Sequence, residues 1–343
     1  MRFPFVLHSV LKLLAAASLA VSATVQAAEV NLYSARQEQL IKPLLDRFTA
    51  ASGIQVNLIT GKADALLERM EREGQNSPAD VLLTTDAGRL NRAKAAGVTQ
   101  AVTSAALASA IPASFRDPEG HWFGLSLRAR PIMYSTERVD PATLSTYEAL
   151  ADPQWRGRIC IRSSGNIYNQ SLVSSMIAAN GIEATETWAK GLVENFARPP
   201  QGGDRDQIKA VAAGQCDIAI ANTYYLAGML TGDDEAQREA AAKVAVFWPN
   251  QNDRGTHVNV SGAAVAAHAK NRDAAVALIE FLANRESQAW YAEVNGEYPV
   301  RPGIGIAQPL ASWGFFRMDP LNLARLGELN ADALRLVDRA GWK

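Results

Sequence analysis

Apolar and polar residues alternate along the first part of the chain in two different periods. Runs of period two, typical of strands, are followed by runs in which apolar residues return at helical spacing. Because strands and helices take turns, the pattern predicts a parallel sheet with right-handed crossovers. The expected elements are strands at 29–33, 54–59 and 80–84 and helices at 40–48 and 66–70.

A second block with the same pattern occupies the middle of the chain. Several of its helical stretches are followed by a glycine, which is suited to end a helix. We expect the two β-rich stretches 124–135 and 255–267 to connect the blocks as crossover strands. The expected elements of the second block are strands at 158–162, 216–221 and 244–248 and helices at 168–180, 186–195 and 207–213.

The two blocks together predict an α/β fold of two doubly wound lobes joined by crossover strands. Such lobes close on a ligand as a hinged clamp, and a doubly wound sheet binds ligands beyond the carboxyl ends of its strands. The first lobe is expected to comprise residues 28–127 and 255–304. The second is expected to comprise residues 128–254 and 305–343.

Residues 1–27 have the pattern of an export signal. Arg2 and Lys12 precede a short apolar run, and small residues ending at Ala27 supply a cleavage site. A transmembrane anchor would need about 20 apolar residues, which this run does not reach. We therefore expect an exported protein that resides in a bacterial periplasm.

Charge and composition exclude several functions. The net charge of −1 gives no basic surface for nucleic acid, so we expect no nucleic-acid partner. Four histidines and two cysteines are too few for most metal centres built from these residues. Nucleotide-binding, zinc-protease and serine-hydrolase motifs are missing from the sequence, and no residue is indicated as a nucleophile. The sequence therefore predicts a binding protein and not an enzyme.

The two cysteines, Cys160 and Cys216, each lie in an apolar, strand-like run. In an oxidising compartment they would form a disulfide if the two strands are neighbours. That bond would stabilise the fold by roughly 4 kcal/mol in the chain-entropy model. The alternative is two buried free thiols, because the sequence does not give the distance between them.

Three tyrosines follow the ends of predicted strands. Tyr224 and Tyr225 come directly after the strand that ends at residue 221, and Tyr168 lies shortly after the strand 158–162. Both loops would lie on the ligand side of the second lobe. For an isolated pair of tyrosines, aromatic packing with hydrogen-bonded hydroxyls is the ordinary interpretation.

Five short motifs that occur in order across the mature chain change this interpretation. They resemble those of the periplasmic ferric-ion-binding proteins of ABC importers, in which two lobes of the type II periplasmic binding protein fold close over Fe³⁺. The resemblance implies that tyrosinates of Tyr168, Tyr224 and Tyr225 bind the metal, and that a monomer delivers it to an ABC permease in the inner membrane. The motifs are Ser34-Ala35-Arg36, Ser163-Ser164-Gly165-Asn166-Ile167-Tyr168-Asn169-Gln170-Ser171, Gly203-Asp204-Arg205-Asp206-Gln207, Asn222-Thr223-Tyr224-Tyr225 and Gly255-Thr256-His257-Val258-Asn259-Val260-Ser261-Gly262.

The acidity of phenol supports ferric iron as the cargo. A phenol has a pKa near 10, so each tyrosinate costs about 4 kcal/mol at pH 7, and three cost about 12 kcal/mol. Mg²⁺ and Ca²⁺ prefer carboxylate and carbonyl oxygens, and Zn²⁺ prefers histidine and cysteine. A small trivalent cation is hard and acidic enough to displace the phenol protons.

Three tyrosinates leave the coordination of an octahedral ion incomplete. Family members often carry a histidine or tyrosine just after the first motif, where this chain has Gln37 and Glu38. Glu38 could be a carboxylate ligand or the solvated start of a helix. Asp86 is a second candidate from the first lobe, and the competing interpretation is a turn or helix cap.

A bound anion is another way to complete the coordination, because relatives without the first-lobe ligand hold carbonate or a similar anion. Arg128 and Arg130 project to one face of a crossover strand, and a guanidinium matches a planar carbonate with two hydrogen bonds. We expect one of them, together with Arg36, to bind the anion. The sequence does not separate Arg128 from Arg130, and surface ion pairs are the alternative for each.

A different cargo is compatible with the same clamp. The lobes could bind an organic anion or a polyamine, with the tyrosine rings stacked on the solute. Replacing Tyr168 or Tyr225 by phenylalanine discriminates between the two functions, because phenylalanine retains stacking and removes the phenolate.

Overall fold

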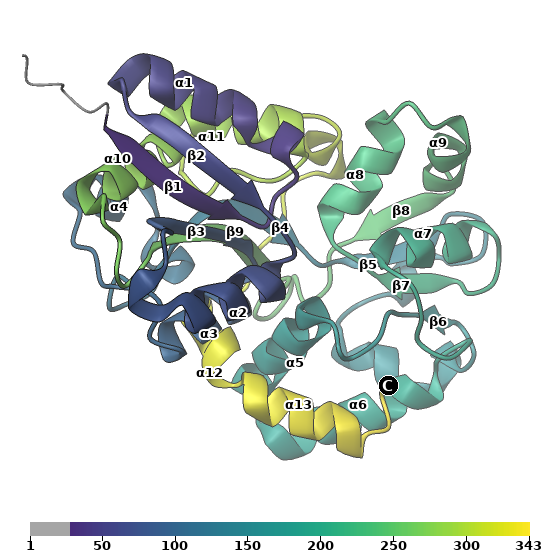
Figure 1. The fold of residues 1–343 in the computed structure, drawn as a ribbon. Helices are drawn as coiled ribbons and strands as arrows, with labels where there is room; N and C mark the ends of the chain where they lie inside the picture. Colours follow the sequence, from purple (N-terminus) through teal and green to yellow (C-terminus); the bar gives the residue numbers. More distant parts are fainter. Residues whose placement is uncertain (1–27) are drawn as a thin grey trace, which may run out of the picture.

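The computed structural model describes residues 28–343, which form two lobes around two separate sheets (Figure 1). The predicted export signal, residues 1–27, lies outside the described residues. Across 28–343, no helix has both the length and the apolar character to cross a bilayer.

The first lobe contains a five-stranded sheet in the order β2-β1-β3-β9-β4. The three strands predicted in the first block are parallel neighbours, as the alternation of strands and helices indicated. β9 lies antiparallel between β3 and β4, so the complete sheet is mixed. The strands are β1 (Glu29–Ser34), β2 (Gln55–Thr60), β3 (Val81–Thr85), β4 (Phe123–Ala129) and β9 (Val258–Val265).

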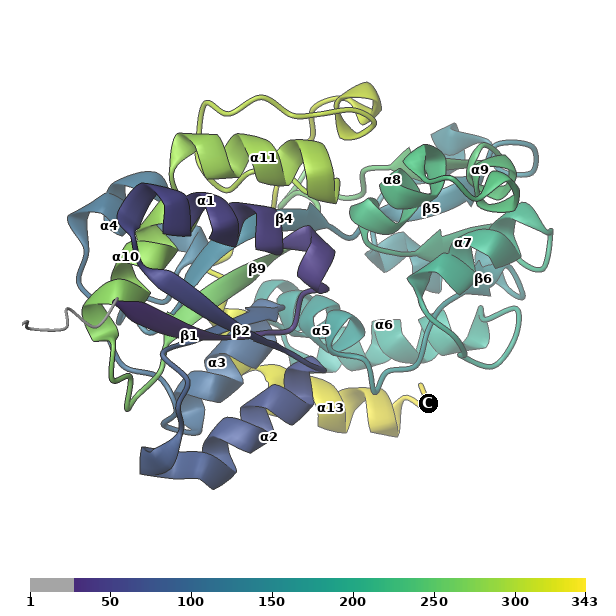
Figure 2. The same ribbon diagram turned by 45° about the horizontal axis from the view of Figure 1, so that its top comes forward.

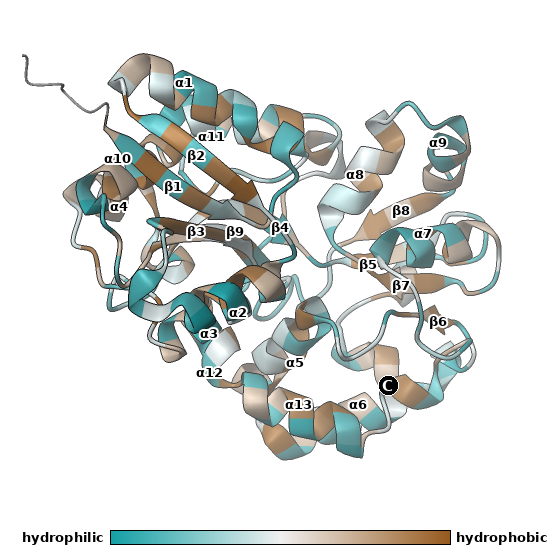
Figure 3. Ribbon diagram, viewed as in Figure 1, coloured by the Kyte–Doolittle hydropathy of each residue, from teal (hydrophilic) through white to brown (hydrophobic). Residues whose placement is uncertain are grey.

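The helices of the first lobe cover this sheet. Figure 3 shows β3 as largely apolar, whereas α2 and α3 carry many hydrophilic residues. The helices are η1 (Glu38–Leu40), α1 (Lys42–Ser52), α2 (Ala63–Glu73), η2 (Gly74–Asn76), α3 (Ala87–Ala95), α4 (Ala105–Ala110), η3 (Ala113–Phe115), α10 (Arg272–Leu282) and α11 (Arg285–Asn295).

The second lobe contains a four-stranded sheet in the order β6-β7-β5-β8. β6 and β7 are parallel, and β5 runs antiparallel between β7 and β8. Strands β6 and β7 are shorter than the apolar runs predicted at 158–162 and 216–221. The strands are β5 (Ile132–Ser135), β6 (Ile159–Cys160), β7 (Ile218–Ile220) and β8 (Val244–Phe247).

Helices surround the second sheet, and the last part of the chain adds further helices after η7. Those that precede β9 are η4 (Pro141–Thr143), η5 (Glu148–Ala151), η6 (Pro153–Trp155), α5 (Ile167–Asn180), α6 (Ile182–Glu194), α7 (Asp204–Ala212), α8 (Thr223–Thr231) and α9 (Glu235–Ala241). Those near the end of the chain are η7 (Leu310–Trp313), α12 (Ala324–Glu328) and α13 (Asn330–Arg339).

Two crossings connect the sheets next to each other. β4 ends at Ala129 and β5 begins at Ile132, so the predicted stretch 124–135 does cross between the lobes. The stretch 255–267 crosses only at its start, because β9 stays within the first sheet, where every one of its residues is buried. The backbone N–H of Arg130 donates to the carbonyl of His257 at 3.0 Å and joins the two crossings.

The C-terminal stretch packs against both lobes. Leu310 and Leu326 belong to the core of the first lobe, whereas Leu336 and Trp342 belong to a core of the second. Residues 305–343 are therefore divided between the cores, while the expectation placed them all in the second lobe. The exact lobe boundaries stay a prediction.

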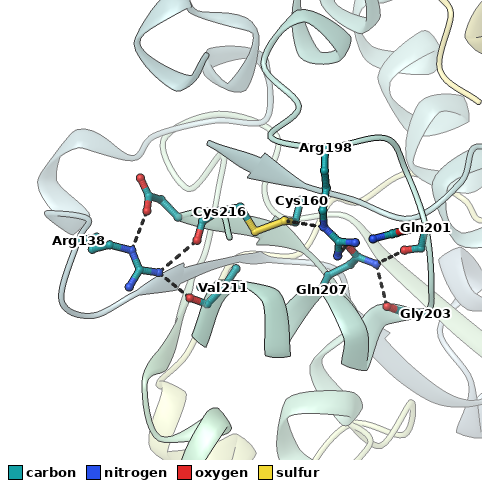
Figure 4. The surroundings of a disulfide bond; sticks show 9 residues. Arg138, Cys160, Arg198, Gln201, Gly203, Gln207, Val211 and Cys216 are labelled. Carbon is teal, nitrogen blue, oxygen red and sulfur yellow. Dashed lines mark hydrogen bonds and ion pairs between the residues drawn. A yellow bond between two sulfur atoms is a disulfide. The ribbon is translucent and has the colours of Figure 1, made fainter. Parts of the chain in front are cut away.

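Cys160 and Cys216 form a disulfide in the second lobe (Figure 4). Cys160 ends β6 and Cys216 precedes β7, and the two parallel strands bring the Cα atoms to 5.8 Å. Of the two alternatives for the cysteines, the structure therefore contains the disulfide.

Candidate functional site

The three tyrosines lie at the starts of two helices that follow neighbouring strands. Tyr168 is in the first turn of α5, where the side chain of Asn166 caps the helix and accepts from the N–H of Tyr168 at 3.0 Å. Tyr224 and Tyr225 are in the first turn of α8, directly after β7. Since β6 and β7 are parallel neighbours, their carboxyl ends place the two helix starts close together. In Figure 1 both helices lie on the side of the second lobe that faces the first lobe.

The tyrosine side chains meet. The hydroxyl of Tyr224 donates to the hydroxyl of Tyr168 at 3.2 Å, and the ring centroids of Tyr224 and Tyr225 are 4.2 Å apart. All three residues are partly exposed and do not lie in separate apolar cores. The structure therefore brings the three predicted tyrosines into one cluster, which we call the tyrosine cluster.

The surroundings of the tyrosine cluster oppose its ionisation in the absence of a cation. Desolvation raises the pKa of Tyr224 well above its ordinary value, and repulsion from Tyr168 and Tyr225 adds to this effect. Desolvation also raises the pKa of Tyr225 to about 12. At neutral pH these phenols are protonated, and only a strong positive charge placed among them would ionise them.

The terminal nitrogens of Arg130 donate hydrogen bonds to side chains of the second lobe. Its Nη1 donates to Asp204 at 2.9 Å and to the side chain of Asn222 at 3.0 Å, and its Nη2 donates to the side chain of Asn169 at 2.7 Å. The residue is 1% exposed. Arg130 is therefore a buried structural cation whose terminal donors are engaged.

Arg128 differs from Arg130 although the two are only two residues apart. Its Nη1 donates to the hydroxyl of Ser261 at 2.9 Å, whereas its Nε and Nη2 are buried without a hydrogen-bond partner among residues 28–343. Buried polar groups are normally hydrogen-bonded, so these two donors indicate a missing acceptor. The guanidinium carbon lies 6.0 Å from the ring centroid of Tyr168.

Arg36 is balanced by a carboxylate. Its Nη2 donates to the hydroxyl of Ser126 at 2.8 Å and forms a buried ion pair with Glu297. Burial would raise the pKa of Glu297, but the charges of Arg36 and Arg128 lower it below its ordinary value. The pair is therefore ionised, and it is not the surface ion pair considered from the sequence.

Glu38 is exposed at the start of the short helix η1. This position corresponds to the solvated helix start that was the alternative to a ligand. It lines a hollow of about 400 Å³ together with residues of α1 and β2, among them Lys42 and Gln55. The structure describes no contact between Glu38 and the tyrosine cluster.

Asp86 is the N-cap of helix α3, which was the alternative to a role as metal ligand. Its Oδ1 accepts from the N–H of Gly88 at 2.9 Å and from the hydroxyl of Ser171 at 2.6 Å, and its Oδ2 accepts from Asn259 at 2.9 Å. Its φ of 82° is a left-handed conformation that aspartate tolerates better than most residues. Both oxygens already have donors, which argues against Asp86 as a ligand.

Sequence reasoning missed three charged residues at the site. Asp204 is fully buried beneath the tyrosine cluster, and the guanidinium carbon of Arg162 lies 5.5 Å from the ring centroid of Tyr168. Glu297 was missed as the partner of Arg36. Asp204 belongs to one of the motifs that carried the resemblance, so that motif was the signal that could have indicated it. Glu297 is 261 residues from Arg36, and no local pattern connects them.

The fold and the site define a class of protein: a two-lobed α/β receptor with a cluster of phenols on one lobe and guanidinium groups opposite. Residues 43–313 match the family model of the bacterial extracellular solute-binding proteins. The chain belongs to this family, and the predicted two-lobed fold class is confirmed.

Individual relatives agree with this assignment. Iron uptake protein A1 of Synechocystis sp. is 52% identical over 315 residues, which cover 92% of this chain and 88% of that protein. A structure of FutA (IdiA) from Trichodesmium in complex with iron and citrate has a TM-score of 0.90 at 52% identity, covering 92% of this chain and 100% of the other. The ferric binding protein from Campylobacter jejuni has a TM-score of 0.87 at 36% identity, with coverage of 92% and 100%. The resemblance to ferric-ion-binding proteins is thereby confirmed.

Proposed function

We propose that this protein captures ferric iron between its lobes in the periplasm and delivers it to an ABC permease in the inner membrane. The observation that carries the proposal is the tyrosine cluster, in which the hydroxyls of Tyr168 and Tyr224 are 3.2 Å apart beside Tyr225. The relatives support the choice of cargo, because their names state iron uptake or ferric binding. The function is binding and transfer, without a catalysed reaction.

The donor set suits Fe³⁺ in particular. Each phenol must lose a proton to bind, at a cost of about 4 kcal/mol at pH 7 even for an unshifted pKa. The raised pKa of Tyr224 and Tyr225 increases that cost. Ca²⁺, Mg²⁺ or Zn²⁺ would instead select carboxylates, carbonyls, histidine or cysteine. Three phenolates also match the charge of Fe³⁺, so the bound ion would add no net charge to the site.

Arg128 is the proposed centre of the anion site. Its two unpartnered donors would bind carbonate or a similar synergistic anion, which would fill coordination positions that the tyrosines leave open. Arg130 would contribute its charge, since its terminal donors are engaged. Arg36 retains an unpartnered Nε and would take a secondary part.

A carboxylate ligand from the first lobe would be Glu38, as the sequence suggested. It would have to leave the hollow that it lines beside α1 in order to reach the metal. In the described arrangement the first lobe therefore contributes mainly positive charge to the site.

The proposal is tested by colour. Purified protein given ferric salt and bicarbonate should develop a visible phenolate-to-iron charge-transfer band, and phenylalanine at Tyr168 or Tyr225 should weaken or remove it. A colourless protein that binds an organic anion or polyamine in calorimetry, with both phenylalanine variants binding normally, would replace iron capture by the alternative function.

A further inference from the structure

Asp204 connects three separate segments beneath the tyrosine cluster. Its Oδ2 accepts from Nη1 of Arg130 at 2.9 Å and from the backbone N–H of Asn222 at 3.0 Å. Its Oδ1 accepts from Nη1 of Arg162 at 3.3 Å. The three donors come from the crossing between the lobes, from the loop that follows β6 and from the residue before α8. The side chain is fully buried, so these bonds do not compete with water.

Each of these donors is next to a tyrosine of the cluster. Asn222 is the residue before α8, whose first turn carries Tyr224 and Tyr225. The guanidinium carbons of Arg130 and Arg162 lie 5.9 and 5.5 Å from the ring centroid of Tyr168. Among residues 28–343 Asp204 thus has no hydrogen bond to a proposed metal ligand, but it binds neighbours of all three.

We propose that Asp204 is a positioning residue for the metal site, an inference that rests on the proposed function. Its carboxylate binds the backbone N–H of Asn222 and so fixes the position of the start of α8 relative to Tyr168. It also engages Nη1 of Arg130, which is then not available to the anion. Arg128 then keeps two unpartnered donors, Nε and Nη2, whereas Arg130 and Arg162 each keep one, Nε, among residues 28–343. Without the carboxylate, Arg130 and Arg162 would lose their counter-charge and would compete with Arg128 for the anion.

Asp217 provides a matched control in the same lobe. Its carboxylate also bridges two arginines, accepting from Nε of Arg138 at 2.8 Å and from Nε of Arg158 at 2.6 Å. It lies before β7, whereas Asn222 and the tyrosine pair follow that strand. Arg138 lies near the disulfide, where its Nη2 donates to the backbone carbonyl of Cys216 at 3.1 Å (Figure 4).

The experiment compares Asp204→Asn with Asp217→Asn in the complete mature protein. Each variant is measured for melting temperature, for the position of the charge-transfer band and for ferric affinity by competition with citrate. Both should lose thermal stability. Asp204→Asn should also weaken ferric affinity by about tenfold and shift the band, as expected for lost charge-assisted hydrogen bonds. Asp217→Asn should keep the wild-type band and affinity.

The outcomes separate the positioning role from the proposed function. If both variants keep the wild-type band and affinity, Asp204 is only structural and the inference is overturned. If the wild type shows no band, the proposed function itself is refuted. Should Asp204→Asn fail to fold, Arg162→Gln serves instead, because that side chain is partly exposed and loses one bond only. It should shift the band in a measurable way, and an unchanged band would overturn the inference.

Discussion

The two lobes bring opposite chemistry to the site. The second lobe supplies three phenols from the starts of α5 and α8, whereas the first sheet supplies Arg128 from β4 and Arg36 after β1. Figure 2 shows the sheets of the two lobes as separate bodies, so each set of groups has its own scaffold. The difference suggests a division of labour. The second lobe would hold the cation, and the first lobe would hold the anion that completes its coordination.

The pH dependence of iron binding should give the largest effect. Burial raises the pKa of Tyr224 well above its ordinary value and the pKa of Tyr225 to about 12, so these two phenols are protonated in the iron-free protein. The complex therefore holds fewer protons than the free protein, and affinity must fall as pH falls. If three protons are displaced, the loss is up to about a thousandfold per pH unit. Titration of the charge-transfer band against citrate at several pH values measures this slope. A slope near zero would show that the second lobe does not bind iron through phenolates.

Removing one phenol should have the next largest effect. Tyr168→Phe or Tyr224→Phe should weaken ferric affinity by more than about a hundredfold, because the loss of a ligand should exceed the 10–100-fold typical of an outer-shell change.

Tyr291→Phe is the matched control for these variants. Tyr291 is fully buried in the core of the first lobe, and its hydroxyl has no hydrogen-bond partner among residues 28–343. The control should therefore keep its affinity and its fold. Equal losses in the control and in the cluster variants would contradict metal binding by the phenols of the tyrosine cluster.

The contribution of the first lobe should be smaller and should depend on the anion. Arg128→Gln removes the guanidinium whose Nε and Nη2 are unpartnered, and ferric affinity in bicarbonate should fall by about tenfold, the value of a charge-assisted hydrogen bond. Without a synergistic anion the variant and the wild type should bind alike. Arg47→Gln is a control, because Arg47 is an exposed first-lobe arginine. An Arg128 variant that loses the same factor with and without bicarbonate would place the anion elsewhere.

The disulfide should affect the stability of the second lobe and leave the site nearly unchanged. Replacing Cys160 and Cys216 by serine should lower the free energy of unfolding by roughly 4 kcal/mol in the chain-entropy model. Ferric affinity should stay within about twofold, since distant sites behave additively. Denaturant unfolding and the citrate competition measure the two quantities. A large loss of affinity at unchanged stability would mean that the disulfide acts on the metal site.

Local pattern predicted most of the fold, whereas the metal and anion residues stay a prediction. The periods of apolar residues gave the parallel strands β1, β2 and β3 correctly. The tyrosines were noticed because they follow strand ends, and the resemblance of their motifs made them candidate ligands. Local pattern failed where an element's role depends on distant neighbours. The stretch 255–267 was predicted to cross between the lobes, but its strand β9 pairs with β3 and β4 and so lies within the first sheet.

Arg128 and Arg130 show why the rest of the site was out of reach. The sequence places both on one face of a strand and makes them equivalent. Their hydrogen-bond partners decide the difference. Arg130 donates to Asp204 and Asn222, which are 74 and 92 residues away, while the side-chain donors of Arg128 find one acceptor, Ser261, among residues 28–343. Asp86 was likewise ambiguous until Ser171 and Asn259 came to occupy its oxygens.

The sequence by itself determined the alternation of strands and helices, the two-lobed α/β class and the tyrosines at the helix starts. These depend on side-chain period and chain order, which are local properties. Only the tertiary structure decided that the cysteines are bonded, that Asp86 is a cap, and that Arg128 alone of the arginine pair keeps two unpartnered donors. Those outcomes depend on which side chains meet across the folded chain, because a buried polar group is costly unless it finds a partner there.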